Sequence, residues 1–212
     1  MQHVTIIGFR KVLGTSLTIP MEMLNAADLM QRIQGGNYRK LQLQLVHPAG
    51  GNIVLTAGLE LVCKHTLADV KHTDLIIVPA LWGNPKGVAR QYPQLLEWLQ
   101  QHADTPVCAV GTGSYFLAEA GLLDNKVATT HPQVILQRDR FITRAGNIYC
   151  AGSVNSVRDV MLHFIEQHYG QAIASEVSRH FTHELKRTYT QSFLNQRPQH
   201  YHEDETVIEI QD

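Results

Sequence analysis

The chain has 212 residues, 44% of them hydrophobic and 17% charged, which is enough apolar material for one globular domain with a short appendage. This composition excludes a disordered or collagen-like chain. With 18 Lys and Arg against 19 Asp and Glu, the formal net charge is -1, so the chain as a whole lacks the basic surface that neutralises phosphates in nucleic-acid-binding proteins.

The three cysteines, Cys63, Cys108 and Cys150, are an odd number without Cys-x-x-Cys spacing, which argues against a disulfide framework and a structural zinc site. The apolar run at the N-terminus is too short for a signal peptide, and no run approaches the roughly 20 residues of a membrane span. We therefore expect a cytoplasmic protein with reduced thiols and no membrane contact.

In the first half of the chain, short apolar runs separated by turn residues predict strands. The expected elements are a strand at 3–9, a helix at about 19–34, a strand at 41–47, and a small hairpin from segments 53–56 and 59–63. Thr18 caps the helix in this prediction, and Pro20 lies in its first turn, where the fixed φ of proline suits a helix.

Residues 74–81 form a continuous apolar run, typical of a central parallel strand with both faces covered. After a loop over WGNPKG, the pattern predicts a helix running to about 102, a buried strand at 105–111, a helix from 114 to Gly121, four short strands within 127–150, and helices at about 154–169 and 171–186. Strands that alternate with helices predict an α/β fold, a three-layer sandwich with a mostly parallel sheet.

The C-terminal tail differs in composition from the rest of the chain. Residues 195–206 are polar and nearly free of aliphatic side chains, as in a linker, and an amphipathic pattern begins at 207. We therefore divide the chain into a domain over 1–192 and, over 193–212, a linker with the start of a second domain. A fraying C-terminal helix is the alternative interpretation of the last residues.

The segment 105–121 is the most informative one, because a buried strand turns abruptly into a helix there. The first N–H groups of such a helix can hold an anion or a carbonyl oxygen, and in enzymes of this topology the corner residue is the nucleophile. Here the corner is Gly111, which has no side chain to attack with. Cys108 lies in the strand itself, where a thiol is usually an inert core residue.

Three strings carry a family resemblance: VPALWG, AVGTGSYFLAEAGLLDNKVATTH and AGSVNSVRDVMLHFIEQHYG. In order and spacing they resemble the class I glutamine-amidotransferase-like superfamily, which includes the PfpI-type intracellular proteases. More narrowly, they resemble the N-terminal domain of AraC-type transcriptional regulators. The resemblance covers most of the chain and implies a flavodoxin-like sheet.

The resemblance also assigns positions to the superfamily's functional residues. Its nucleophilic cysteine falls at Gly111, and its small helix-starting residues fall at Thr112 and Gly113. Catalytic relatives carry an acidic residue shortly before the proline of the first helix, and this position falls at Ser16. Their histidine after the helix that follows the corner matches His131. Because the nucleophile and the carboxylate are both missing, the resemblance implies no catalytic residue.

We therefore expect a catalytically inactive, effector-sensing domain without a cofactor or a resident metal. The expected ligand-binding residues are Ser16, Trp82, Gly111, Thr112, Gly113 and His131. Such a cleft suits a small metabolite with a carboxylate or carbonyl, such as an amino-acid- or betaine-like effector. The implied partners are a second copy of the chain in a homodimer and DNA, which a C-terminal helix-turn-helix domain not contained in this chain would contact.

Alternatives remain open at several of these positions. A cysteine-dependent amidase or protease, or a glyoxalase-like hydrolase, would need Cys108 at the corner, and a purely structural dimerisation module would bind no ligand. His131 is either a pocket residue or a surface histidine, and Trp82 either closes a pocket or packs on a neighbouring helix. His180 and His183 have the spacing of a metal pair on a helix, but helix-surface residues are favoured because no further ligand lies at a suitable distance.

Overall fold

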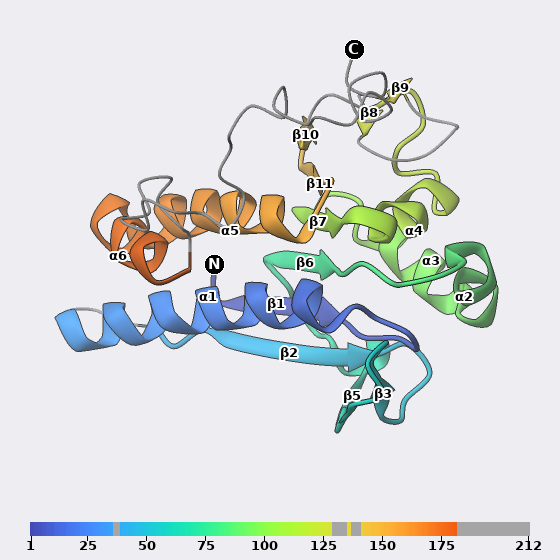
Figure 1. Cartoon of the computed structure of the whole chain (residues 1–212), viewed down its shortest axis with the longest axis horizontal. Helices are drawn as coiled ribbons and strands as arrows, with labels where there is room; N and C mark the ends of the chain where they lie inside the picture. The colour runs from blue at the N-terminus through green and yellow to red at the C-terminus, as the bar shows by residue number, and fades with distance from the viewer. Residues whose placement is uncertain (36–38, 129–134, 137–140, 182–212) are drawn as a thin grey trace, which may run out of the picture. The chain divides into compact units, whose positions relative to one another are not determined.

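The computed structural model describes residues 1–35, 39–128, 135–136 and 141–181, and the following description concerns the unit Met1–Phe181 (Figure 1). The expected boundary at 192, the linker and the final amphipathic segment lie outside the described residues.

A seven-stranded sheet runs through this unit in the order β10-β11-β7-β6-β1-β2-β5. Its strands are β1 (His3–Ile7), β2 (Gln42–His47), β5 (His65–Thr66), β6 (Leu75–Val78), β7 (Val107–Val110), β10 (Ile142–Ala145) and β11 (Ile148–Ala151). Neighbours pair in parallel except β10 with β11, which form an antiparallel hairpin at one edge. The central strands β6 and β7 are buried along their whole length, as their continuous apolar runs predict.

Two short pairs of strands lie outside the main sheet. They are the antiparallel hairpin β3 (Ile53–Val54) with β4 (Glu60–Leu61), and the parallel pair β8 (Val127–Ala128) with β9 (Ile135–Leu136). The hairpin expected at 53–63 is therefore confirmed.

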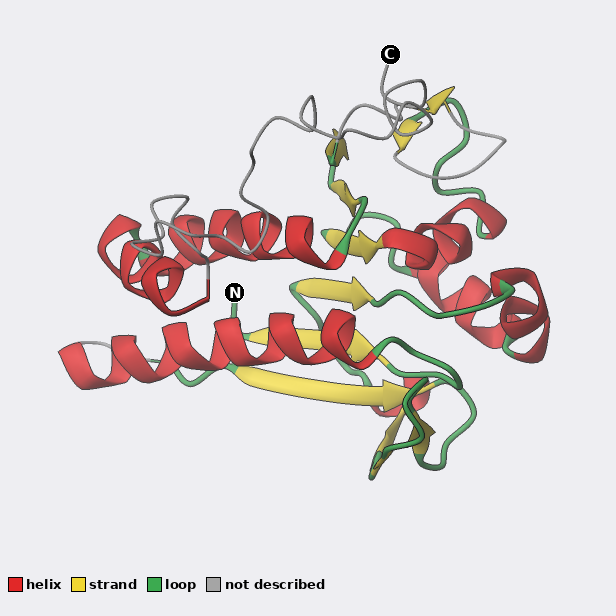
Figure 2. Cartoon of the chain, viewed as in Figure 1, coloured by secondary structure: helices red, strands yellow, loops and turns green. Residues whose placement is uncertain are grey.

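The helices form two groups, and each group contacts the sheet (Figure 2). One group consists of α1 (Gly14–Gln34), α5 (Val154–Tyr169) and α6 (Gln171–Phe181), which pack on one another. The other consists of α2 (Pro85–Gln91), α3 (Pro93–Gln101) and α4 (Ser114–Glu119). This arrangement confirms the predicted α/β sandwich with a mostly parallel sheet.

Two local predictions were wrong. The first helix begins at Gly14, before Thr18, so Pro20 lies inside it; the Thr18 hydroxyl donates to the Gly14 carbonyl within the helix (3.0 Å) instead of capping it. The segment expected to be a loop after residue 81 contains α2, whose start is fixed by Asn84 as N-cap, with its Oδ1 accepting from the Lys86 N–H (3.0 Å). Proline at the first helical position supports the same start.

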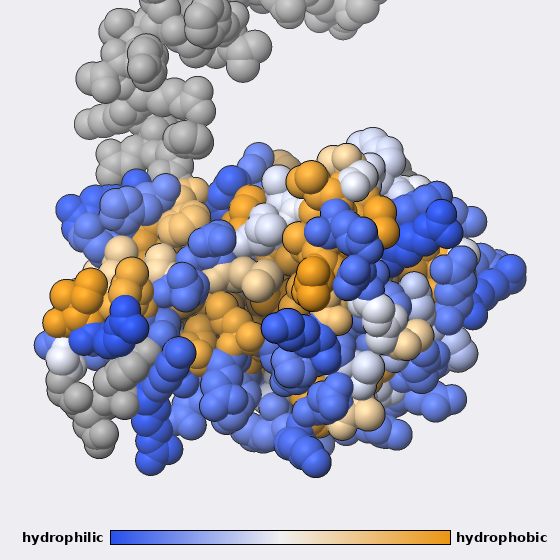
Figure 3. Space-filling model, turned by 90° about the horizontal axis from the view of Figure 1, so that it is seen from below, coloured by the Kyte–Doolittle hydropathy of each residue, from blue (hydrophilic) through white to orange (hydrophobic). Residues whose placement is uncertain are grey.

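The later helix was predicted correctly at both ends. The Ser153 hydroxyl accepts from the Ser156 N–H (3.2 Å), and Gly170 ends the helix with φ +86°, a conformation that glycine adopts without strain. Beyond the buried core, Figure 3 shows a face on which hydrophilic side chains predominate and hydrophobic ones lie in separate groups. The large hydrophobic side chains that are exposed among the described residues are Leu29, Ile33, Val54, Leu59, Val62, Trp82 and Phe141.

Candidate functional site

The corner between β7 and α4 lies where the sequence predicts it. The chain leaves β7 at Val110 and passes through the 3-10 turn η2 (Gly111–Gly113) into α4. Gly111 has φ +48°, in the left-handed region that costs other residues strain. A Cβ atom at this position would lie 3.6 Å from the Ala80 Cβ and 4.0 Å from the Gly152 carbonyl oxygen, which are ordinary contacts. There is thus room for a small group at the corner, although the backbone favours glycine.

Gly113 is required for a different reason, the close approach of two backbone segments. A Cβ atom there would overlap the Val78 carbonyl oxygen and would lie only 2.7 Å from that of Pro79. The turn into α4 therefore packs directly on the backbone at the end of β6. The close packing fixes the position of the corner relative to the neighbouring strand.

Thr112 ties the corner to the segment that follows β6. Its hydroxyl accepts a hydrogen bond from the Leu81 N–H and donates one to the Leu81 carbonyl, both at 2.8 Å. One hydroxyl thus satisfies both the N–H and the carbonyl of the buried Leu81. Without it, these two groups would need partners from a neighbouring strand.

Ser16 ties the start of α1 to the same segment. Its fully buried hydroxyl accepts from the Ala80 N–H (3.0 Å) and donates to the Leu13 carbonyl (2.7 Å). The Leu13 N–H in turn donates to the Ala80 carbonyl at 2.8 Å. The ends of β6 and β7 and the start of α1 are therefore held together by hydrogen bonds to two successive residues, Ala80 and Leu81.

The structure thus brings together five of the six residues predicted to bind ligand: Ser16, Trp82, Gly111, Thr112 and Gly113. The hydroxyls of Ser16 and Thr112 are occupied by backbone partners, which nothing in the sequence could have shown. The Trp82 side chain is 70% exposed, so it is free of the helix packing considered as an alternative. The sixth residue, His131, lies outside the described residues.

Cys108 does not lie at the corner. It is inside β7, where it pairs in register with Ile77 of β6, and its side chain is completely buried. Burial strongly raises the pKa of the Cys108 thiol, and the nearby Cys150 adds to the effect. Burial also raises the pKa of Cys150 to about 11. At neutral pH both thiols are protonated, and thus poor nucleophiles.

Metal ligation and membrane spanning were also considered for the described part of the chain. Among the described residues, no group of three or more His, Cys, Asp or Glu side chains is arranged to hold a metal ion. His180 lies 3.7 Å from Glu176 through its Nε2 atom, and its expected companion His183 lies outside the described residues. No helix in the described parts of the chain has both the length and the apolar character needed to cross a membrane.

Comparison with known proteins shows what the chain as a whole is similar to. A helix-turn-helix transcriptional regulator, CdhR of Pseudomonas aeruginosa, is 32% identical over 145 residues, which is 62% of this chain and 42% of that protein. An isonitrile hydratase of Pseudomonas putida is 30% identical over 141 residues, which is 61% of this chain and 60% of that protein. The chain therefore spans less than two thirds of the length of either relative.

The fold has a close match among solved structures. An AraC family transcriptional regulator from Pseudomonas putida superposes with a TM-score of 0.71 at 23% identity, covering 86% of this chain and 100% of that one. The model of the DJ-1/PfpI family matches residues 3–167. These findings confirm the resemblance seen in the sequence: the chain belongs to the DJ-1/PfpI family.

Proposed function

We propose that this domain binds a small effector at the corner after β7 without catalysing a reaction, and that it is the regulatory domain of an AraC-type transcription factor. The similarity to CdhR, a helix-turn-helix regulator, supports the regulatory role. In the proposed protein, effector binding favours one arrangement of two subunits in a cytoplasmic homodimer, and a separate helix-turn-helix module contacts DNA. Each ligand can shift that arrangement only by as much as its affinity differs between the two states.

The observation that carries the proposal is the residue at the corner. Gly111 keeps the left-handed backbone of a strand-to-helix elbow (φ +48°) at the position where the resemblance expects a nucleophilic cysteine. The bend and its surroundings are retained while the reactive atom is absent. A site of this kind can hold a polar ligand but has no group at its centre to form a covalent bond.

We infer the chemical class of the effector from the groups that surround Gly111. We place the ligand in the space beside Gly111, between the Ala80 methyl group and the Gly152 carbonyl, with backbone N–H groups of Thr112 and Gly113 as donors to a carboxylate or carbonyl. The hydroxyls of Ser16 and Thr112 serve by holding the 80–81 segment.

Further groups at the rim extend this proposed site. The exposed ring of Trp82 can cover a cationic part of the ligand, as aromatic faces do for quaternary ammonium groups. His131 is proposed as a further pocket residue. An amino-acid- or betaine-like metabolite combines the required carboxylate with such a cation.

The proposal is tested by ligand-induced thermal shifts with a panel of amino acids and quaternary ammonium carboxylates, comparing the protein with Gly111→Ala and Gly58→Ala. The methyl group added in Gly111→Ala would fill the corner, whereas a Cβ at Gly58 meets nothing within 4 Å although φ there is also positive (+83°). A ligand at about 100 times its Kd should add about 2.7 kcal/mol of stability to the unmodified chain and to Gly58→Ala. Gly111→Ala should lose the shift. An equal shift in both variants, or none with any compound, contradicts the proposal.

A second candidate function, hydration of an isonitrile, is favoured by the similarity to the Pseudomonas putida hydratase. A thiol-dependent hydratase would need its cysteine at the corner. In this chain the buried Cys108 lies three residues before the corner, inside β7. We therefore expect no turnover of isonitriles by this chain. If the chain hydrates an isonitrile at a measurable rate, and Cys108→Ala abolishes this activity, the sensor proposal is rejected and the chain is an enzyme.

A further inference from the structure

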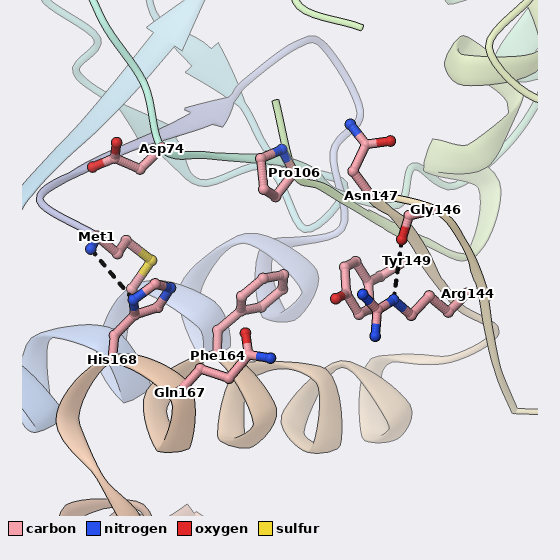
Figure 4. A pocket seen from close by; sticks show the side chains of 10 residues that line it. All are labelled: Met1, Asp74, Pro106, Arg144, Gly146, Asn147, Tyr149, Phe164, Gln167 and His168. Carbon is pink, nitrogen blue, oxygen red and sulfur yellow. Dashed lines mark hydrogen bonds between the residues drawn. The ribbon is translucent and has the colours of Figure 1, made fainter. Parts of the chain in front are cut away.

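A cavity of about 520 Å³ lies at the end of the sheet opposite the corner (Figure 4). Its lining includes Asp74 and Pro106, which precede β6 and β7, together with the β10–β11 hairpin and the C-terminal half of α5. None of the five described residues that were predicted to bind ligand lines it. It is large enough for a small metabolite.

Arg144 of β10 supplies a cation to this cavity and is held in place by two contacts. Its Nε atom donates to the Gly146 carbonyl (3.0 Å), and its guanidinium carbon lies 5.1 Å from the centre of the Tyr149 ring (Figure 4). Within the described residues Arg144 forms no ion pair, and its two terminal Nη atoms donate to no protein acceptor. The edge formed by these two Nη atoms matches a carboxylate in a bidentate fork.

The turn behind Arg144 is itself fixed. The Asn147 side-chain amide donates to the carbonyls of Ala103 (2.7 Å) and Thr105 (2.8 Å), which anchors the hairpin to the segment leading into β7. Because the turn holds the Gly146 carbonyl, it also holds the Nε end of the guanidinium. Because the Arg144 side chain is already ordered, the entropic cost of ligand binding is lower.

The wall beside the guanidinium is apolar and aromatic. Tyr149 of β11 and Phe164 of α5 are both more than nine-tenths buried, with ring centres 4.9 Å apart. The one carboxylate among the described lining residues, Asp74, is occupied elsewhere: it accepts from the backbone N–H groups of Gln2 (2.6 Å) and His3 (3.0 Å) and from His72. Figure 4 shows its oxygens directed away from Arg144. The described part of the cavity wall therefore presents an unpaired guanidinium next to an aromatic surface.

We infer that this cavity binds a small carboxylate with an apolar, ring-sized body. Its carboxylate pairs with the Nη atoms of Arg144, and its body lies against Tyr149 and Phe164. The site is separate from the corner near Gly111, so it constitutes a second ligand site of the domain.

Isothermal titration with benzoate, and with neutral benzamide of the same shape, tests this inference on the full chain. The variants are Arg144→Gln, Arg144→Lys, and Arg90→Gln as a control, since Arg90 is an exposed arginine on α2 and its loss changes the charge equally. Loss of a charge-assisted pair should weaken benzoate binding by about 10- to 100-fold in Arg144→Gln. Arg144→Lys should lie between, and Arg90→Gln and Gly111→Ala should leave the Kd unchanged.

The inference would be overturned by a lack of benzoate binding to the unmodified chain, by equal affinity for benzamide and benzoate, or by equal affinity in Arg144→Gln and Arg90→Gln. Arg144 is exposed, so the substitution should leave the unfolding curve without ligand in place. Binding that disappears in Gly111→Ala but survives in Arg144→Gln would assign benzoate to the corner and reject the second site.

Discussion

The two ends of strand β7 use polar groups in opposite ways. At the carboxyl end, the hydroxyls of Ser16 and Thr112 are occupied by backbone groups of Ala80 and Leu81. At the other end, near the start of the strand, Arg144 keeps two nitrogen atoms without a protein partner among the described residues. Polar groups that satisfy one another contribute to stability, whereas a positioned but unpaired cation contributes to recognition. Removing the hydroxyl of Ser16 or Thr112 should therefore lower the free energy of unfolding, whereas substitution of Arg144 should weaken ligand binding without lowering it.

The largest effect is expected at Gly113. In Gly113→Ala the new methyl group collides with backbone oxygen atoms of Val78 and Pro79, which cannot move without shifting β6. We expect a loss of about 3 kcal/mol or more in the free energy of unfolding, measured by urea denaturation. Gly87→Ala in α2 is the matched control, because a Cβ there meets nothing within 4 Å and should stabilise the helix by up to about 1 kcal/mol. Equal stability of the two variants would contradict the close packing.

Removing the Ser16 hydroxyl should have the next largest effect. Ser16→Ala leaves the Ala80 N–H without its acceptor in a fully buried position, which should lower the free energy of unfolding by about 1–3 kcal/mol. Thr18→Ala, on the exposed side of the same helix, should change it by less than about 0.5 kcal/mol. If both variants unfold at the same urea concentration, the Ser16 bonds do not hold this end of the sheet together.

A smaller loss is expected at Thr112, which is only half-buried. Thr112→Val keeps the shape of the side chain but removes both hydrogen bonds to Leu81, and we expect a loss of about 1 kcal/mol. Thr112→Ser retains the hydroxyl and should lose less. Comparison of their thermal unfolding midpoints checks the order, and a reversed order would show that the methyl group, not the hydroxyl, matters there.

The smallest effect is a pH dependence at the Arg144 end of the sheet. Burial alone would raise the pKa of Asp74, but hydrogen bonds from Gln2, His3 and His72 outweigh it and lower the pKa to about 2. A pKa below the unfolded value of about 3.9 means that the stabilisation is complete above about pH 4 and is lost as the pH falls towards 2. Asp74→Asn should flatten the decline of stability in that window. An unchanged decline in urea midpoints between about pH 5 and about pH 2.5 would reject this role.

Much of the fold is readable from the sequence because the central strands are continuous apolar runs and the later helix carries a side-chain cap. The first helix was misplaced because Thr18 and Pro20 imitate a helix start, whereas the true start at Gly14 has Leu13 as its N-cap and no capping side chain. Helix α2 was missed although Asn84 followed by Pro85 is a readable start signal.

The candidate site was predictable only in part. The corner at Gly111 follows from a strand that turns directly into a helix. The occupation of the Ser16 and Thr112 hydroxyls could not be foreseen, because their partners are backbone atoms 64 and 31 positions away in the sequence. No sequence motif marks the Arg144 cavity. Its lining residues come from a hairpin, a helix and the segments before two strands, which only the folded chain brings together.

Whether the corner reacts or only binds is tested most directly by alkylation of the native protein with iodoacetamide at neutral pH, followed by mass spectrometry of each cysteine. We predict that the half-buried Cys63 is modified first, while Cys108 and Cys150 react only after unfolding. Rapid and selective modification of Cys108 in the folded chain would contradict a binding domain without a nucleophile.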